Sequence, residues 1–180
     1  GNNIIAQACY QIAKEFDIEP YDEHTGKGIL RHVIGRIGQS GWMIILVTAT
    51  EQLPHKEKWV EKLTERIPQV ETIVHNVNGK RTNVILGPKN NILYGDGTIT
   101  DHIKDLQFTL SPHSFFQVNP EQTTVLYDQA LEYADLKGDE TVIDAYCGTG
   151  TISLFLAHKA KHVIGIEIVE PAIINARENA

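Results

Sequence analysis

The first half of the chain combines two stretches with a helical spacing of apolar residues and several short apolar runs bounded by turn residues. The polar segment 39–41 separates two of these runs, and this arrangement predicts a β-hairpin. The expected elements are, in order, helix 2–16, strands 28–38 and 42–50, helix 54–68, and strands 70–78, 83–87, 91–95, 98–103 and 106–111. Strands grouped around a helix predict an α+β domain.

The pattern changes near residue 110, where longer periodic stretches begin to alternate with single apolar runs. The expected elements are helix 120–138, strand 141–147, helix 151–160, strand 162–168 and a helix that begins at 170. This β-α-β-α order predicts parallel strands with a right-handed crossover. The residues expected to face inward on the first of these helices are Leu126, Ala130, Tyr133 and Ala134, and Gly138 is expected to end it.

The sequence thus predicts an α/β protein with two domains, 1–109 and 110–180. We expect the second domain to be incomplete, because two strands are fewer than the roughly five or six of a usual sheet. The unpaired edges of such a sheet invite strand pairing between copies, so dimerisation of the chain is expected.

Composition and charge indicate the expected cellular location of the protein and the kind of partner that each half can bind. The two cysteines form no disulfide framework, and neither a long apolar run nor a signal peptide is present, so we expect a cytoplasmic protein without a membrane partner. The net charge of −7 is uneven. Residues 1–108 hold 12 Lys and Arg against 13 Asp and Glu, whereas residues 109–180 hold 4 against 10. A polyanion would therefore bind the first half.

The segment DAYCGTG carries the candidate chemistry of the second half. Gly148 and Gly150 permit a tight turn after a strand, close to a ligand, and Asp144 lies near the end of that strand. Glu167 ends the next strand, at the position from which a carboxylate accepts hydrogen bonds from ribose hydroxyls. The alternative is a strand–helix turn that needs glycine for shape alone.

The spacing also discriminates among nucleotides. A dinucleotide-binding turn would have a third glycine where Ser153 stands, and a phosphate-binding P-loop would have a lysine after its last glycine. S-adenosyl-L-methionine has no phosphate and requires neither feature. The pattern D-x-x-x-G-x-G with a downstream acid resembles the first motifs of a class I methyltransferase, with its Rossmann-like fold.

Longer motifs point to a family. The segments SPHSFFQVNPEQTTVLY, VIDAYCGTGTISL and VIGIEIVEPAI together resemble the RNA uracil-5-methyltransferases, which modify 23S ribosomal RNA or the T-loop of transfer RNA. The segment YDEHTGKGILRHVIGRIG resembles the central domain of the bacterial ribosomal-RNA members. The resemblance extends from about residue 10 to residue 180. It implies S-adenosyl-L-methionine as cofactor and RNA as partner, 23S ribosomal RNA first and transfer RNA second.

The resemblance also assigns roles to single residues. Gln117 would contact the cofactor from the linker, Tyr146 would line its pocket and Glu167 would bind the ribose. Each has an alternative, since Gln117 also suits a linker amide and Tyr146 a core position. Phe115 and Phe116 would stack on a flipped uracil, or would pack in the core between domains.

In this family a cysteine thiolate adds to C6 of uracil and a glutamate removes the proton from C5. Neither Cys147, inside the cofactor turn, nor Cys9, on an apolar helical stripe, suits the role of the thiolate. The resemblance places both catalytic residues beyond residue 180. We therefore expect a fragment that contains no catalytic residue and is inactive alone.

Arg31 and His32 are the candidate RNA contacts of the first half. The alternative is that they are solvated charges on a strand, which would give the same sequence pattern. The histidines show no ligand spacing, and no metal is expected.

Two other functions stay open. One is a class I methyltransferase with another RNA position or another substrate; the other is a non-catalytic RNA-binding module.

Overall fold

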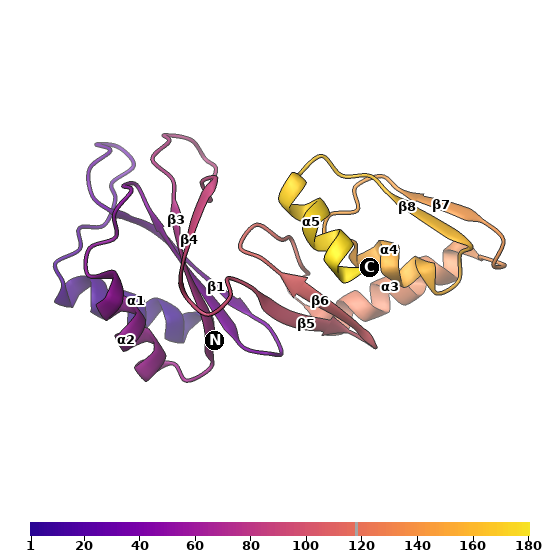
Figure 1. Ribbon diagram of the computed structural model, residues 1–180, viewed down its shortest axis with the longest axis horizontal. Coiled ribbons are helices and arrows are strands. Elements are labelled where there is room, and N and C mark those ends of the chain that lie inside the picture. The colour runs from indigo at the N-terminus through magenta and orange to yellow at the C-terminus, as the bar shows by residue number, and fades with distance from the viewer. Residues whose placement is uncertain (118) are drawn as a thin grey trace. The chain divides into compact units, whose positions relative to one another are not determined.

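The computed structural model describes residues 1–117 and 119–180 and divides into two compact units, Gly1–Ile99 and Thr100–Ala180 (Figure 1). The sequence placed the border between residues 109 and 110. The structure has it earlier, because the hairpin of β5 (Ile99–Ile103) and β6 (Leu106–Leu110) packs through β6 against helices of the second unit.

The first unit is a four-stranded sheet with two helices. Its remaining elements are α1 (Asn2–Glu15), β1 (Leu30–Ile37), β2 (Trp42–Thr48), α2 (Lys56–Arg66), β3 (Val70–Val77) and β4 (Lys89–Tyr94). The strand order is β1-β2-β3-β4; β2 and β3 are parallel, and the other neighbours are antiparallel. The predicted hairpin of β1 and β2 is confirmed. The helix α2 forms the crossover between the parallel strands, and α1 lies beside it (Figure 1).

The core of this unit follows from the helical and strand periodicities. Ile5 and Ile12 on α1 and Trp59 and Leu63 on α2 are fully buried together with Ile44 on β2. Burying one such side chain contributes about 1.5–3 kcal/mol relative to leaving it exposed. The apolar face of each helix therefore fixes it to the sheet.

One predicted strand of the first unit is wrong. Residues 83–87 form an irregular loop instead. The side-chain amide of Asn78 donates hydrogen bonds to the carbonyls of Val84 (2.6 Å) and Ile85 (3.0 Å), and Asn76 bonds both backbone groups of Gly87. These side chains satisfy backbone groups that a strand would have paired with a neighbour.

The second unit is built on a β-α-β segment with parallel strands. In addition to the hairpin it contains α3 (Pro120–Ala134), β7 (Thr141–Asp144), α4 (Thr151–Ala157), β8 (His162–Gly165) and α5 (Glu170–Asn179). The predicted parallel pairing is confirmed, with Asp144 opposite Gly165. The helix α4 packs on both strands and on α3, and α5 packs on β6. None of the helices in the described ranges is long and apolar enough to cross a membrane.

The predicted inward face of α3 differs from the observed one. Leu126 and Tyr133 are exposed, whereas Thr123 and Tyr127 are buried. The Tyr127 hydroxyl bonds Thr151 Oγ1 at 2.8 Å, and its ring meets the Phe155 ring edge-on. A buried tyrosine with a partner for its hydroxyl gains both apolar contact and a hydrogen bond. The helix also ends at Ala134, ahead of Gly138.

Candidate functional site

The turn between β7 and α4 has the open backbone that its glycines predict. Gly148 and Gly150 have positive φ angles of 54° and 83°, and the Gly150 amide donates to the Cys147 carbonyl at 2.8 Å. A Cβ on Gly148 would meet no atom within 4 Å. The backbone at Gly148 therefore faces free space into which a ligand can come close.

Asp144 ties this turn to the helix that follows it. Its Oδ2 accepts a hydrogen bond from Ser153 Oγ at 2.6 Å, and its Oδ1 accepts a longer one from the Tyr146 amide at 3.4 Å. Ser153 occupies the position at which a dinucleotide-binding turn would have its third glycine. Here that position serves to hold the carboxylate that shapes the turn.

Glu167 reaches the same turn from the end of β8. Its Oε1 accepts from the amides of Val169 (2.8 Å) and Ile168 (2.7 Å), and its Oε2 accepts from the Gly148 amide at 3.2 Å. The Val169 amide first, then that of Ile168, lowers the pKa of this carboxyl below its usual value. A carboxylate accepts about four hydrogen bonds, so Oε2 retains capacity for a ribose hydroxyl.

Tyr146 projects from the turn and is 91% exposed. It is therefore not a core residue at a strand end, which was the alternative interpretation of the sequence. A large exposed ring beside an open glycine turn is suited to stacking on a heterocyclic ligand.

The two phenylalanines of the segment 111–117 differ in exposure. Phe115 is 73% exposed, whereas Phe116 is half-buried, and its ring centroid lies 5.8 Å from that of Phe108. Phe116 thus packs against Phe108, and the exposed Phe115 stays a candidate for stacking on a base. Gln117 is half-buried at the end of this described segment.

Two asparagines of α5 hold both loops of the site, and sequence reasoning missed them. Asn175 Oδ1 accepts from the hydroxyls of Ser111 (2.9 Å) and Ser114 (2.8 Å). Asn179 accepts from the Thr109 amide and donates to the carbonyl of Thr149, at 2.8 and 3.0 Å. The four-residue spacing of the asparagines, one helical turn, was the available signal.

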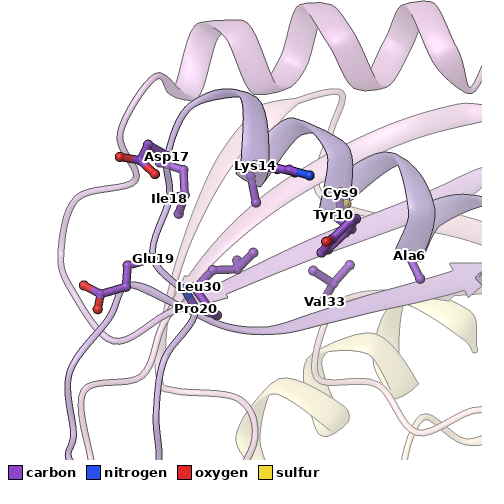
Figure 2. A pocket seen from close by; sticks show the side chains of 11 residues that line it. Ala6, Cys9, Tyr10, Lys14, Asp17, Ile18, Glu19, Pro20, Leu30 and Val33 are labelled. Atoms are coloured by element: carbon purple, nitrogen blue, oxygen red, sulfur yellow. The ribbon is translucent and has the colours of Figure 1, made fainter.

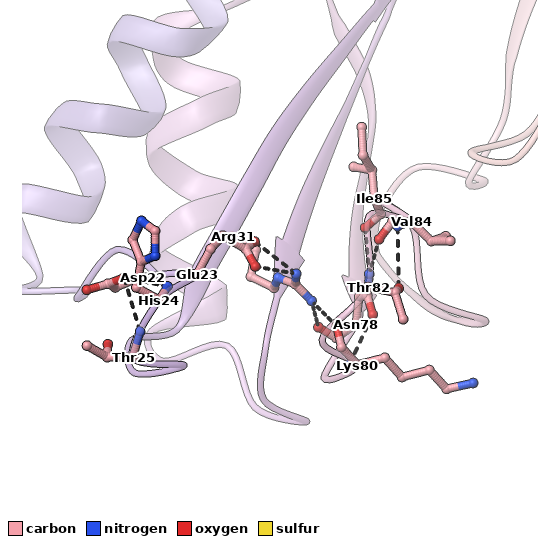
Figure 3. A network of polar contacts seen from close by, with 10 residues as sticks. All are labelled: Asp22, Glu23, His24, Thr25, Arg31, Asn78, Lys80, Thr82, Val84 and Ile85. Carbon is pink, nitrogen blue, oxygen red and sulfur yellow. Dashed lines mark hydrogen bonds and ion pairs between the residues drawn. The ribbon is translucent and has the colours of Figure 1, made fainter.

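Arg31 has a buried guanidinium with structural partners (Figure 3). The side chain is 1% exposed and donates to the carbonyls of Asn78 and Lys80, both at 2.7 Å, and to Glu23 at 2.9 Å. It also lies 4.6 Å from the centroid of the Tyr21 ring. These contacts join two loops of the first unit. They correct the expectation that Arg31 contacts RNA phosphates, since its donors point into the protein.

Neither thiol of the chain is suited to nucleophilic chemistry. Burial raises the pKa of Cys9 to about 12. Burial also raises the pKa of Cys147, with smaller contributions from Asp144 and Glu167. Cys9 borders an apolar hollow of about 720 Å³ between α1 and β1 (Figure 2), where the exposed Tyr10 and the partly buried Val33 face each other across the groove.

Comparison with known proteins links the site to a family. A family described as "Methyltransferase domain" matches residues 136–180. An uncharacterized RNA methyltransferase of Halalkalibacterium halodurans is 54% identical over 99% of this chain and 40% of its own length. One of Bacillus cereus is 52% identical over 99% of this chain and 39% of its own length. The chain thus spans about two fifths of the curated relatives that it matches.

A solved structure extends the comparison. The tRNA (uracil-54, C5)-methyltransferase of Pyrococcus abyssi, in complex with S-adenosyl-L-homocysteine, has a TM-score of 0.79 and 26% identity. The match covers 96% of this chain and 42% of that protein. The fold class predicted from the sequence and the predicted resemblance to RNA methyltransferases are confirmed.

Proposed function

We propose that this chain, which is 54% identical to an RNA methyltransferase over 99% of its length, forms part of an enzyme that methylates C5 of a uridine in 23S ribosomal RNA, with S-adenosyl-L-methionine as cofactor. The observation that carries the proposal is the open glycine turn with the ionised Glu167 bound to the Gly148 amide at 3.2 Å. An open backbone, a carboxylate with spare capacity and an exposed ring at Tyr146 fit a nucleoside cofactor.

Each residue of the site has a role in this proposal. Glu167 accepts a hydrogen bond from a ribose hydroxyl, Tyr146 packs on the nucleoside, and Gln117 supplies an amide from the linker. Gly148 and Gly150 allow close approach, and Asp144 keeps the turn in place through Ser153. When bound, the cofactor supplies an electrophilic methyl group.

We place the nucleophile of the reaction outside this chain. Addition of a cysteine thiolate to C6 makes uracil C5 nucleophilic, and C5 then takes the methyl group from the cofactor sulfonium. A base removes the C5 proton while the C6–S bond breaks and releases the thiolate. The raised pKa values of Cys9 and Cys147 argue against both thiols. The chain alone would therefore transfer no methyl group, and turnover by residues 1–180 would contradict this mechanism.

The test uses the complete enzyme with RNA that carries tritium at C5 of uridine. Methylation at C5 releases tritium to water in step with methyl incorporation. Methyl incorporation without tritium release would instead identify another position or a different class I chemistry. Neither signal, together with RNA binding, would identify a non-catalytic RNA-binding module.

Transfer RNA is the second candidate substrate, because the Pyrococcus abyssi protein is a tRNA methyltransferase. The resemblance of residues 21–38 to ribosomal-RNA enzymes favours 23S ribosomal RNA. Parallel reactions with transcripts of both RNAs decide between them, and faster incorporation into transfer RNA would reverse our order.

We further propose that the isolated chain self-associates through the β7–β8 sheet. Ile143 and Ile164 are neighbours across the strands, and both are more than half exposed. An apolar face beside unpaired strand edges favours association with a second copy. Light scattering that gives the monomer mass at high concentration would disprove this.

A further inference from the structure

The first unit contains a hollow between two loops, 21–28 and 79–87. The residues that line it are Glu23, His32, Arg81, Thr82, Asn83 and Ile85. Its volume of about 400 Å³ lies within the range of small-ligand pockets. Of these residues only His32 was considered above as a contact for a ligand, so the ligand must be inferred from their chemistry.

The loop 79–87 is held in a fixed shape by two buried asparagines, Asn76 on β3 and Asn78 directly after it. Figure 3 shows the contacts of Asn78. Asn78 bonds the carbonyls of Val84 and Ile85 and accepts from the Lys80 amide at 3.2 Å. Asn76 accepts from the Gly87 amide at 2.7 Å and returns a bond to the Gly87 carbonyl. An irregular loop that is bonded along its length presents its remaining side chains in one arrangement, as a binding site requires.

The loop 21–28 is fixed by local bonds and by its neighbour. Asp22 Oδ1 accepts from the amides of His24 (2.8 Å) and Thr25 (3.3 Å). Arg81 Nη2 donates to the Thr25 carbonyl at 2.8 Å, passing so close to Gly26 that a Cβ there would lie 1.7 Å from it. The absence of a side chain at Gly26 thus lets Arg81 span the two loops.

The charges at the hollow favour an anion at its mouth. Arg31 pairs with Glu23, the acidic member of the lining. Arg81 keeps donors beyond the one that binds Thr25 and is exposed, and the Lys80 side chain extends outward from the network (Figure 3). An arginine fork and a nearby lysine are the usual partners of a phosphate.

The interior offers neutral polar groups and one apolar surface. Burial first, and then the charge of Arg31, lower the pKa of His32, so its ring is neutral at pH 7 and presents one donor and one acceptor. Asn83 adds an amide, and Ile85, which is about half exposed, adds an apolar wall. Such a set recognises the edge and the face of an unstacked base.

From this arrangement we infer that the hollow binds one unpaired nucleotide of the RNA substrate, with its phosphate at Arg81 and its base against His32, Asn83 and Ile85. This inference rests on the proposed function for the identity of the polyanion. It assigns an RNA contact to the first unit, whereas the cofactor site belongs to the second.

The test measures binding of a labelled single-stranded oligouridine of about ten nucleotides to the complete protein. Arg81→Ala should weaken binding about tenfold and reduce the salt slope by about 0.7, the contribution of one phosphate contact to a single strand. Arg81→Lys should restore the slope. His32→Ala should weaken binding several-fold with an unchanged slope. Lys56→Ala on α2 removes an exposed cation elsewhere and serves as the matched control.

Binding of Arg81→Ala and His32→Ala within twofold of the wild type would overturn the inference. Uridine monophosphate that competes with the oligouridine at equal concentration would also overturn it, in favour of a free nucleotide. Calorimetry with S-adenosyl-L-homocysteine separates the two proposals. If the variants of the hollow bind RNA more weakly and still bind the cofactor, the result supports RNA binding at the hollow. If the complete enzyme methylates no RNA, the proposed function is refuted, but the inferred RNA contact is not.

Discussion

Replacing Arg31 with alanine tests whether the guanidinium holds the two loops of the first unit together. The side chain bonds two backbone carbonyls and one carboxylate, and no more than 1% of it is exposed. Truncation leaves the carbonyl of the buried Asn78 without this donor. It also frees Glu23 and removes the cation from the face of Tyr21.

The cost can be estimated contact by contact. A buried carbonyl that loses a charged donor costs about 1–3 kcal/mol. Water replaces the guanidinium at the exposed Lys80 and Glu23, so each of these bonds contributes only about 0.5 kcal/mol. The stacked stem and cation on Tyr21 contribute about 0.5–1 kcal/mol. We therefore expect Arg31→Ala to lower the free energy of unfolding of the first unit by about 3 kcal/mol.

Tryptophan fluorescence during urea unfolding measures this unit alone, since Trp42 and Trp59 are the two tryptophans of the chain. With a slope of about 2 kcal/mol/M, the midpoint should fall by about 1.5 M. Arg31→Lys keeps the charge but loses the fork, and should cost about half as much. Arg66→Ala, on the surface of α2, is the control. A loss for Arg31→Ala no larger than that of Arg66→Ala would refute the structural role.

Three further changes test the second unit, one of them at its thiol. Glu167→Gln should weaken the binding of S-adenosyl-L-homocysteine at least tenfold, as measured by calorimetry. Because the pKa of Glu167 is lowered, the wild-type affinity should stay constant from pH 8 to about pH 5. It should fall only as the pH drops through that lowered pKa. Asn179→Ala should destabilise the second unit by about 1–2 kcal/mol and speed hydrogen exchange at the Thr109 amide, whereas unchanged exchange there would exclude the clamp. Cys147→Ser should leave methyl transfer by the complete enzyme within a few-fold of wild type, and a loss of several orders of magnitude would identify Cys147 as the nucleophile.

The regular elements could be predicted because their cause is local. The apolar faces of α1 and α2 repeat with the helical period, and the turn at 39–41 fixes the hairpin of β1 and β2. The apolar residues of 83–87 predict a strand, but the asparagines that bind its carbonyls lie on β3 and directly after it, and they hold the segment as a loop. On α3 the apolar residues indicated one face, but a tyrosine with a hydroxyl partner is buried on the other.

Some residues of the candidate site could likewise be placed from the sequence, whereas the long-range contacts of others could not. Asp144, Gly148 and Glu167 could be placed from the sequence, because their positions follow from a strand end and a turn. The two carbonyls that Arg31 binds lie 47 and 49 residues away, and the two serines that Asn175 binds lie 61 and 64 residues away. Contacts at such separation depend on topology, which periodicity does not specify. For Arg31 this changed the interpretation from an RNA contact to a structural residue.

Asparagines in both units satisfy the backbone groups of irregular loops. A binding loop that is not part of a sheet or helix still has backbone groups that must be satisfied, and an asparagine offers a donor and an acceptor from one rigid group. Asn76 uses both on Gly87, and Asn179 uses both to join Thr109 to Thr149. An aspartate of the same size would keep only the acceptor and would set a negative charge against a carbonyl oxygen. The amide is therefore required at these positions, and size alone does not explain the choice.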